Sequence, residues 1–412
     1  MEAIRGTAPR RARRSGQPAP RRRGRRRSAV DASGFKLPGA AALAPYLVGA
    51  VIGGLAVWLG LRLGWNGARA TASIARPDPV TTPAAGFDWS THPEPAFPIP
   101  PYARFLEGVK LVLDPGHVGQ RDRPNWKRGP TGLREAEVNL RVTRFLREFL
   151  LAVDADVILT REIDESLDVD DDADLRQRAE IANNLRADLL LSVHHNAADD
   201  PAANYTTVFY HGNGSHSPAS LCAARHLLTG LNDALRLERH VECALWSDYE
   251  IYPPPKNDGF AVLRQARVPA VLTESSFHSN PDEEQRLRDP LYNRREAYGL
   301  FLGLARWAQA GLPRVSVAEA GNGKSDRGRT LVVQLDDGLS RREGKGSRVA
   351  KMLPGTLRVE LDGRALNHRL DEARGELRVT LPSGAKRGRL RVDFENIFGQ
   401  HVLHPWIDLG GD

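Results

Sequence analysis

The sequence contains very little cysteine, which limits the kinds of fold and site that it can build. Cys222 and Cys243 are the only two cysteines in 412 residues. Two are too few for a disulfide framework, and their spacing does not fit the C-x-x-C pattern of cysteine-ligated zinc sites. One disulfide in an oxidising compartment stays open, although two buried free thiols are the simpler interpretation. A disulfide-stapled fold and a cysteine zinc site are therefore not indicated.

Excess positive charge is missing from most of the chain. The formal net charge is +7, but residues 1–36 alone hold 12 Arg and Lys against Glu2 and Asp31. The remaining residues hold 46 basic against 49 acidic side chains, a balance of −3. A nucleic-acid-binding surface on the folded body is therefore not supported, and the basicity belongs to an Arg-rich tail.

This tail leads into a long apolar run. Residues 40–61 carry no charged side chain, and 22 residues rise about 33 Å as a helix, enough to cross a hydrocarbon core of about 30 Å. We expect a transmembrane signal anchor over residues 37–65, with the Arg-rich tail in the cytoplasm and the rest on the extracytoplasmic (periplasmic) side of the cytoplasmic membrane. A cleaved signal peptide is the alternative, because Ala70-Thr71-Ala72 has the A-x-A spacing.

The remaining sequence divides by its periodicity. Residues 66–106 are rich in Pro, Ala and Thr and are expected to form a linker. Residues 107–312 alternate strand-like runs such as KLVLD and ADLLLSVHHN with helical stretches such as EVNLRVTRFLREFLLAV. This alternation predicts an α/β domain with a mainly parallel, twisted sheet flanked by helices.

The C-terminal part has a different pattern. After a second linker at 313–327, the runs LRVEL, ELRVTL and RLRVDF alternate in character and are separated by turn signals. We expect residues 328–412 to form a small antiparallel β-sandwich, Ig-like in type. Its exposed arginines, such as Arg358, Arg378 and Arg391, suggest an acidic partner. Glycan binding, contact with an envelope protein and a spacer role are all open for this domain.

Several chemistry-bearing residues stand at predicted strand ends or helix starts. His117 ends the run LVLDPGH, a histidine pair (His194, His195) ends LLLSVHHN, and Glu274 ends VPAVLTE. A glutamate pair (Glu135, Glu137) begins the first long helix. Two histidines and a glutamate would make a zinc site with the fourth position left for water, and a further carboxylate could take that water's proton. The pattern alone does not choose within either pair.

These motifs resemble, in order, those of the zinc-dependent N-acetylmuramoyl-L-alanine amidases of the amidase-3 type. The resemblance rests on LVLDPGH, GLREAEVNL, DLRQRAEIANNLRADLLLSVHHNA and GFAVLRQARVPAVLTESSFHSNPDEE, and covers about residues 110–310. It implies that one Zn²⁺ is held by His117, Glu135 and His194, with Glu274 as the catalytic glutamate. Glu137 and His195 are then left outside the site.

The implied function is hydrolysis of the amide bond between N-acetylmuramic acid and L-alanine in peptidoglycan, for cell-wall remodelling or daughter-cell separation. The alternative is a catalytically silent peptidoglycan-binding or envelope-scaffolding protein. Other zinc hydrolases are disfavoured, because the chain contains no H-E-x-x-H and no P-C-x-x-C. Asp114 either orients a metal ligand or caps a turn. The other histidines, His278 among them, are expected to pack in the core or lie on the surface.

Overall fold

The computed structural model describes residues 97–118, 127–168, 170–213, 218–320, 329–339, 348–385 and 387–410. The chain divides into two units, Met1–Ala85 and Gly86–Asp412, and every described residue belongs to the second. The Arg-rich tail, the expected membrane anchor and most of the expected Pro-rich linker lie outside the described residues. Within the described ranges, no helix combines the length and the apolar character needed to span a membrane.

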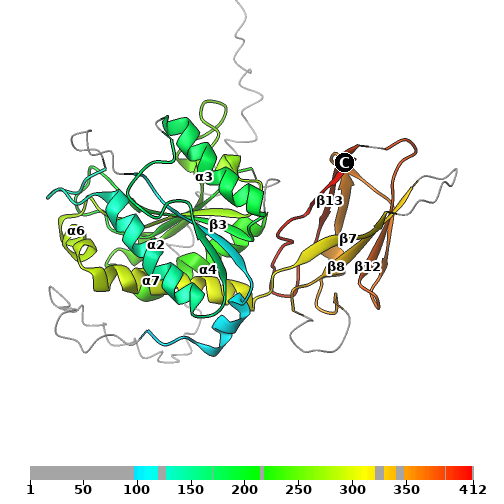
Figure 1. Ribbon diagram of the computed structural model, residues 1–412, viewed down its shortest axis with the longest axis horizontal. Coiled ribbons are helices and arrows are strands. Elements are labelled where there is room, and N and C mark those ends of the chain that lie inside the picture. The colour runs from blue at the N-terminus through cyan, green and yellow to red at the C-terminus, as the bar shows by residue number, and fades with distance from the viewer. Residues whose placement is uncertain are drawn as a thin grey trace, which may run out of the picture. The chain divides into compact units, whose positions relative to one another are not determined.

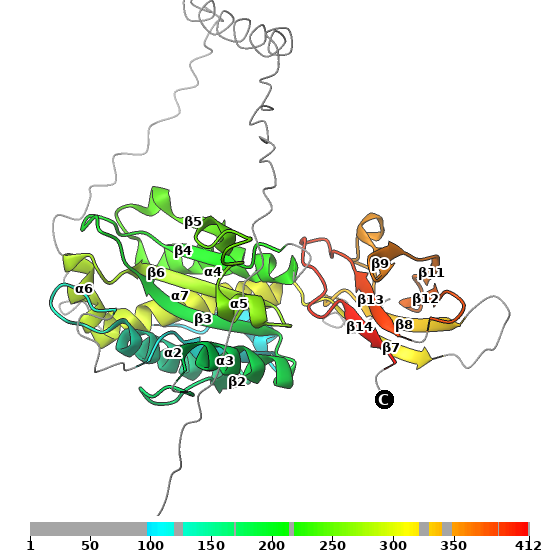
Figure 2. The same ribbon diagram turned by 90° about the horizontal axis from the view of Figure 1, so that it is seen from above.

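The first domain is built on a six-stranded, mainly parallel sheet with the order β2-β1-β3-β6-β4-β5. All neighbouring pairs are parallel except β4 and β6, which are antiparallel. Figure 2 shows β5, β4, β6 and β3 side by side. The strands are β1 (Lys110–Pro115), β2 (Asp156–Leu159), β3 (Leu189–Asn196), β4 (Thr207–Tyr210), β5 (Ala244–Ser247) and β6 (Ala270–Phe277). The predicted α/β architecture is confirmed.

Helices cover both faces of this sheet. On one face lie α2, α4 and α7, and α3 lies on the other (Figure 1). The α-helices are α2 (Glu135–Leu151), α3 (Asp171–Leu185), α4 (Pro218–Leu235), α5 (Ala261–Gln265), α6 (Pro281–Arg288) and α7 (Pro290–Gln309), and the short 3₁₀ turns are η1 (Pro101–Leu106), η2 (His240–Glu242) and η3 (Asp248–Glu250).

The strand residues alternate between two separate cores. In β3, Leu189, Leu191 and Val193 belong to the core that includes residues of α2, α4 and α7. Leu190 belongs to the smaller core that includes residues of α3 and α5. A central strand of a parallel sheet is buried on both faces, which explains the unbroken apolar run in the sequence. Neighbouring side chains of β3 therefore face different environments.

The structure extends both domains into the predicted linkers. The 3₁₀ turn η1 lies in the linker expected at 66–106, and it buries Ala103 and Leu106 in the first core. Strand β7 (Arg314–Ala320) lies in the linker expected at 313–327 and pairs with β8. The alternating run VSV within β7 is too short to predict a strand, because a polar stretch follows it directly.

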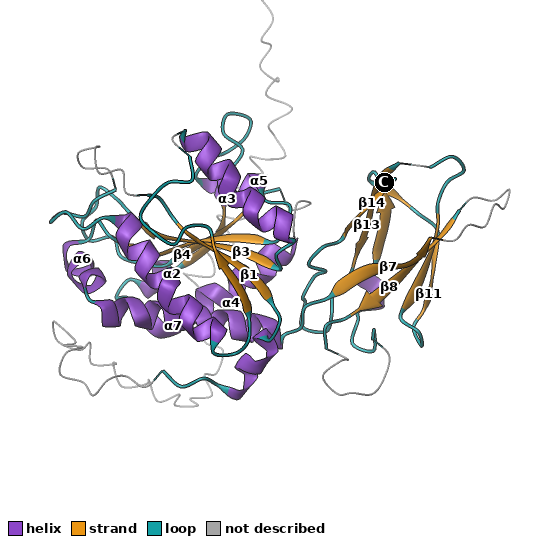
Figure 3. Cartoon of the chain, viewed as in Figure 1, coloured by secondary structure: helices purple, strands orange, loops and turns teal. Residues whose placement is uncertain are grey.

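The C-terminal domain consists of two four-stranded antiparallel sheets, and its described helical turns are limited to the 3₁₀ turn η5 (Pro354–Thr356) (Figure 3). Its strands are β7, β8 (Thr330–Asp336), β9 (Arg358–Leu361), β10 (Arg364–Ala365), β11 (His368–Asp371), β12 (Glu376–Thr380), β13 (Gly388–Asp393) and β14 (Trp406–Leu409). Residues of both sheets share one apolar core. The predicted antiparallel β character is confirmed.

Two expectations about side chains need correction. Arg391 is not exposed: it is 9% exposed and pairs with Asp393 at 2.8 Å. Asp393 offers a buried charge, so the arginine turns toward it and not toward solvent. Both cysteines are free, but only Cys222 is buried, whereas Cys243 is partly exposed.

Candidate metal centre

The register of the sheet brings the predicted site residues together. Asp114 of β1 is the partner of Ser192 in β3, and His194 of β3 is the partner of Glu274 in β6. Partners in neighbouring strands point to the same face of a sheet. The three strands therefore present Asp114, Ser192, His194 and Glu274 on one face, near their carboxyl ends, where sites of open α/β sheets lie.

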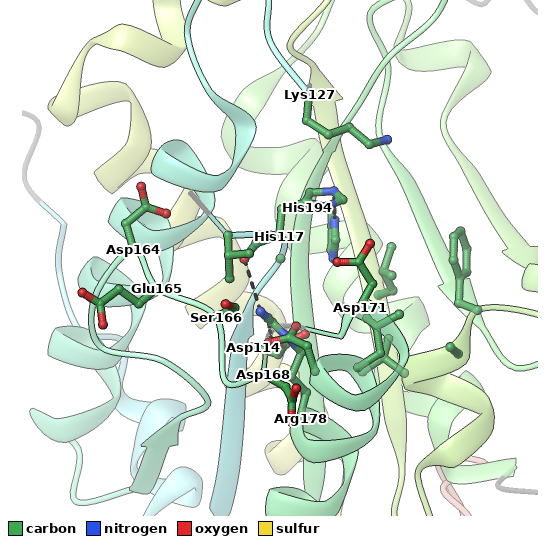
Figure 4. Close-up of a pocket in the computed structure, with 18 of the residues that line it drawn as sticks. Asp114, His117, Lys127, Asp164, Glu165, Ser166, Asp168, Asp171, Arg178 and His194 are labelled. Carbon is green, nitrogen blue, oxygen red and sulfur yellow. Dashed lines mark hydrogen bonds and ion pairs between the residues drawn. The ribbon is translucent and has the colours of Figure 1, made fainter. Parts of the chain in front are cut away.

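His117 follows β1 in a backbone conformation that needs support. Its φ of 57° is in the left-handed region, which costs a non-glycine residue about 1–2 kcal/mol. Two buried arginines hold this turn through its carbonyl oxygens. Arg161 donates to the carbonyls of Pro115 at 3.0 Å and Gly116 at 3.1 Å. Arg178 donates to the carbonyl of His117 at 3.3 Å, as Figure 4 shows.

Three ligand-type atoms converge at this turn. The His117 Nε2 and His194 Nδ1 atoms are 3.2 Å apart, and each lies 3.2 Å from an oxygen of Glu135. Glu135 reaches this point because it begins α2, and its side chain is 1% exposed. Zinc bonds of about 2.0–2.1 Å imply about 3.3–3.4 Å between neighbouring ligands of a tetrahedron. The three residues therefore form a group that could hold a metal ion, and the spacing of their atoms is compatible with zinc.

The protonation states also suit a divalent cation, which needs neutral histidines and an ionised carboxylate. Burial lowers the pKa of His194, which favours the neutral imidazole. Burial alone would raise the pKa of Glu135, but its contacts with His117 and His194 hold it well below its usual value, which favours the ionised carboxylate. A donor set of two histidines and one carboxylate is one that zinc uses in catalytic sites.

Asp114 orients one of these ligands through a serine. The Ser192 hydroxyl donates to Asp114 Oδ2 at 2.6 Å, so its oxygen is free to accept from His194 Nε2 at 3.2 Å. With the proton on Nε2, the Nδ1 lone pair of His194 faces the other two ligand atoms. Of the two interpretations of Asp114, orientation of a ligand is thus supported by the structure.

Asp114 is itself strongly held. Arg178 Nη1 donates to it at 2.7 Å, and the Thr160 hydroxyl donates at 2.6 Å. Burial alone would raise the pKa of Asp114, but the charge of Arg178 and the hydrogen bonds of Ser192 and Thr160 lower it to about 2. Asp114 is therefore ionised at neutral pH and can accept a hydrogen bond from the Ser192 hydroxyl.

Glu274 lies in the same cavity and has the properties of a proton carrier. Its Oε2 atom is buried and has no hydrogen-bond partner among the described residues. Burial and the charge of Glu135 raise the pKa of Glu274 well above the ordinary value. Catalytic glutamates are tuned upward in this way so that they can take up and release a proton near neutral pH.

A cavity of about 870 Å³ opens over these residues. His117, His194, Asp114 and Glu274 line it together with Lys127, Tyr252 and Phe260. Figure 4 shows His117 and His194 next to each other, with Lys127 beyond His194 and Asp164 and Glu165 on the far side of His117. The cavity is large enough to admit part of a polymeric substrate beside the ligand cluster.

The sequence pattern could not choose between Glu135 and Glu137 or between His194 and His195. In the structure, the side chains of Glu137 and His195 lie apart from the cluster. The Glu137 side chain is 45% exposed and pairs with Arg134 and Arg141. His195 is buried on the opposite face of β3, where its ring contacts Asn139 at 2.8 Å and Glu296 at 3.0 Å.

Three residues that contact a ligand or the turn at His117 were not identified from the sequence: Ser192, Arg161 and Arg178. His278, which we expected to pack in the core or lie on the surface, is buried with its Nε2 atom 3.5 Å from Glu135. His278 carries no recognisable signal, because a histidine after an apolar strand packs in the core far more often than it serves a site.

Comparison with known proteins agrees with these motifs. A family model described as N-acetylmuramoyl-L-alanine amidase matches residues 111–306. The probable cell wall amidase LytH of Staphylococcus epidermidis is 28% identical over 202 residues, 49% of this chain and 59% of the relative. The germination-specific N-acetylmuramoyl-L-alanine amidase of Bacillus subtilis is 29% identical over 215 residues, 50% of this chain and 83% of the relative.

Among solved structures, the catalytic domain of the N-acetylmuramoyl-L-alanine amidase CwlV from Paenibacillus polymyxa is 26% identical. The match covers 48% of this chain and 97% of that domain with a TM-score of 0.40. The chain spans 59% of the length of the LytH relative, less than two thirds. Family model and relatives agree on the same stretch, and residues 111–306 of this chain are therefore similar to the amidase-3 family of N-acetylmuramoyl-L-alanine amidases.

Proposed function

We propose that the chain is a zinc-dependent N-acetylmuramoyl-L-alanine amidase that acts on peptidoglycan. The observation that carries this proposal is the cluster of His117, Glu135 and His194 ligand atoms, spaced as one zinc ion requires, beside the unpartnered carboxylate of Glu274. The bond cleaved is the amide between the lactyl group of N-acetylmuramic acid and L-alanine. The match of residues 111–306 to the family model of N-acetylmuramoyl-L-alanine amidases supports this choice of bond.

The protein's own residues supply positioning and proton transfer. A zinc ion at the cluster would act as a Lewis acid on the amide carbonyl and would lower the pKa of water toward about 7. Glu274, with its raised pKa, takes the proton of the attacking water and returns it to the departing amine. Ser192 and Asp114 keep His194 in the tautomer that presents Nδ1.

The test compares full-length wild-type protein with Glu274→Gln and His194→Ala on purified peptidoglycan, with zinc content measured in parallel. Mass spectrometry should show wild type releasing stem peptides that carry a free L-alanine amine, and a chelator should stop this until zinc returns. Glu274→Gln should keep its zinc and lose about 10²- to 10⁴-fold in rate. His194→Ala should lose both zinc and activity.

Glu137→Gln is the matched control, because it makes the same chemical change on an exposed glutamate of α2 that is not part of the ligand cluster. It should leave zinc and rate unchanged. If Glu274→Gln cleaves at the wild-type rate, Glu274 is not the base. If zinc-loaded wild type stays on the wall without cleaving it, the silent peptidoglycan-binding alternative is favoured.

We also propose that the protein is a single-pass protein of the cytoplasmic membrane, with this domain on the extracytoplasmic side. The support is the uncharged run 40–61 after an Arg-rich tail. Alkaline carbonate should leave the protein in the membrane fraction, and protease added outside spheroplasts should digest the catalytic domain. Release by carbonate would contradict an anchor.

A further inference from the structure

A buried histidine beside the metal cluster has no partner. His278 is 2% exposed, and neither of its ring nitrogens makes a hydrogen bond among the described residues. Leaving a buried polar group unsatisfied costs about 1–3 kcal/mol, so each such group calls for an explanation. The nearest charged atom recorded for His278 is Oε2 of Glu135, 3.5 Å from its Nε2.

The backbone fixes where this ring can be. His278 directly follows β6, and its N–H donates to the carbonyl of Asn196 at the end of β3, at 2.9 Å. Its own carbonyl lies against Gly129, where an added Cβ would come within 2.6 Å of it. The histidine is thus held between two chain segments and has little freedom to choose another partner.

The two oxygens of Glu135 have different surroundings. Oε1 accepts the backbone N–H of His195 at 3.1 Å and the side-chain amide of Asn139 at 3.3 Å. Oε2 faces His117 Nε2 at 3.2 Å and His278 Nε2 at 3.5 Å. His117 must offer a lone pair to a metal, so it cannot also donate a proton here. His278 is then the donor available to Oε2.

We propose that His278 is a positioning residue whose Nε2–H donates to Oε2 of Glu135 and fixes this carboxylate for metal binding. A shift of about 0.5 Å would give an ordinary N–H···O distance. An imidazole ring carries at least one N–H in either protonation state, so His278 can donate from Nε2. Glu135 then has donors on both oxygens. This inference rests on the proposed zinc centre.

The test measures zinc binding and not turnover. Full-length wild type, His278→Leu and His278→Gln are titrated with Zn²⁺ against a chromophoric chelator, and the visible spectrum of each Co²⁺-substituted protein is recorded. Loss of a hydrogen-bond partner of a metal ligand typically weakens binding 10- to 100-fold. His278→Leu should show about this loss and an altered Co²⁺ spectrum. His278→Gln places an amide N–H near the Nε2 position and should restore most of the affinity.

The outcomes separate this inference from the proposed function. If His278→Leu binds zinc within about twofold of wild type, the positioning role is wrong while the zinc centre stands. If His278→Leu and His278→Gln weaken zinc binding equally, a hydrogen bond donated to Glu135 is not the cause, and the inference is overturned. If wild type itself binds no zinc, the metal centre and this inference both fail. Thermal unfolding of each variant with chelator present shows whether an affinity loss comes from misfolding.

Discussion

Replacing Arg178 by Met removes the charge at the centre of the support behind the metal cluster. Arg178 is 1% exposed and lies in α3. Its guanidinium donates to Asp114 at 2.7 Å, to Asp174 at 2.6 Å, to the carbonyl of Pro115 at 3.0 Å and to that of His117 at 3.3 Å. Methionine keeps much of the aliphatic stem but leaves two buried carboxylates without their partner.

The expected loss is large compared with the stability of a domain. Removing one partner of a buried ion pair costs about 3–5 kcal/mol, against about 5–15 kcal/mol for the whole free energy of unfolding. We expect Arg178→Met to remain folded at 25 °C, with a free energy of unfolding near the lower end of the range for whole domains. Adding Asp114→Asn should recover part of this loss, because asparagine leaves no buried charge without its partner at this position.

The pH dependence has a definite sign. The pKa of Asp114 is depressed in the folded state, so its contribution is present above pH 4 and is lost as the pH falls toward 2. About 1 kcal/mol should be gone at pH 3. Arg178→Met should therefore cost less at pH 3 than at pH 7, and a background carrying Asp114→Asn should not show this difference.

Urea unfolding followed by circular dichroism at 222 nm measures this loss. The described α-helices all lie between Glu135 and Gln309, so this signal reports the first domain. A chelator keeps zinc from contributing through linkage. Arg176→Met, an exposed arginine of the same helix, is the matched control and should change stability by less than about 0.5 kcal/mol. A loss below about 1 kcal/mol for Arg178→Met, or an equal loss at both pH values, would refute the reasoning.

Four further changes test other parts of the structure. Gly116→Ala would place a Cβ 2.2 Å from the ring of His194, so zinc affinity measured by chelator competition should fall at least about tenfold; unchanged affinity would contradict this contact. Gly230→Ala would place a Cβ 2.2 Å from the carbonyl of Gly299 in α7, and the free energy of unfolding measured in urea should fall by about 1–3 kcal/mol. Asp248→Asn weakens the hydrogen bonds to Gly212 and Phe260 N–H groups and should lower the melting temperature without changing zinc affinity. Adding zinc at 100 times its dissociation constant to the zinc-free protein should raise the free energy of unfolding by about 2.7 kcal/mol. An unchanged melting temperature would argue against a zinc centre.

Much of the first domain could be predicted from the sequence because each strand ends in a recognisable way. The run LVLDPGH couples an apolar strand to a turn and a histidine, and the same logic placed the pair His194 and His195, and also Glu274, at strand ends. Parallel strands bring their carboxyl ends to one edge of the sheet, so residues distant in the chain could be expected to meet.

The residues that support the ligands could not be predicted in this way. Arg178 acts through the carbonyls of Pro115 and His117, and carbonyl acceptors leave no trace in the residue types of the turn. Ser192 lies in the middle of an apolar run, where a serine is more often a packing residue. His278 depends on a contact across chain segments, to Glu135, that no local pattern records.

The alternation of β3 decides which of two adjacent histidines can serve the site. Leu189, Leu191 and Val193 point into one core, so His195 must follow them there and meet Asn139 and Glu296. His194 lies on the other face with Leu190 and Ser192. A slip of one residue would bring His195 to the cavity and bury His194 without Ser192 behind it. Because both faces of β3 are apolar, this choice cannot be read from the strand alone. It is fixed by the pairing of His194 with Glu274, so the contacts that build the core also select the metal ligand.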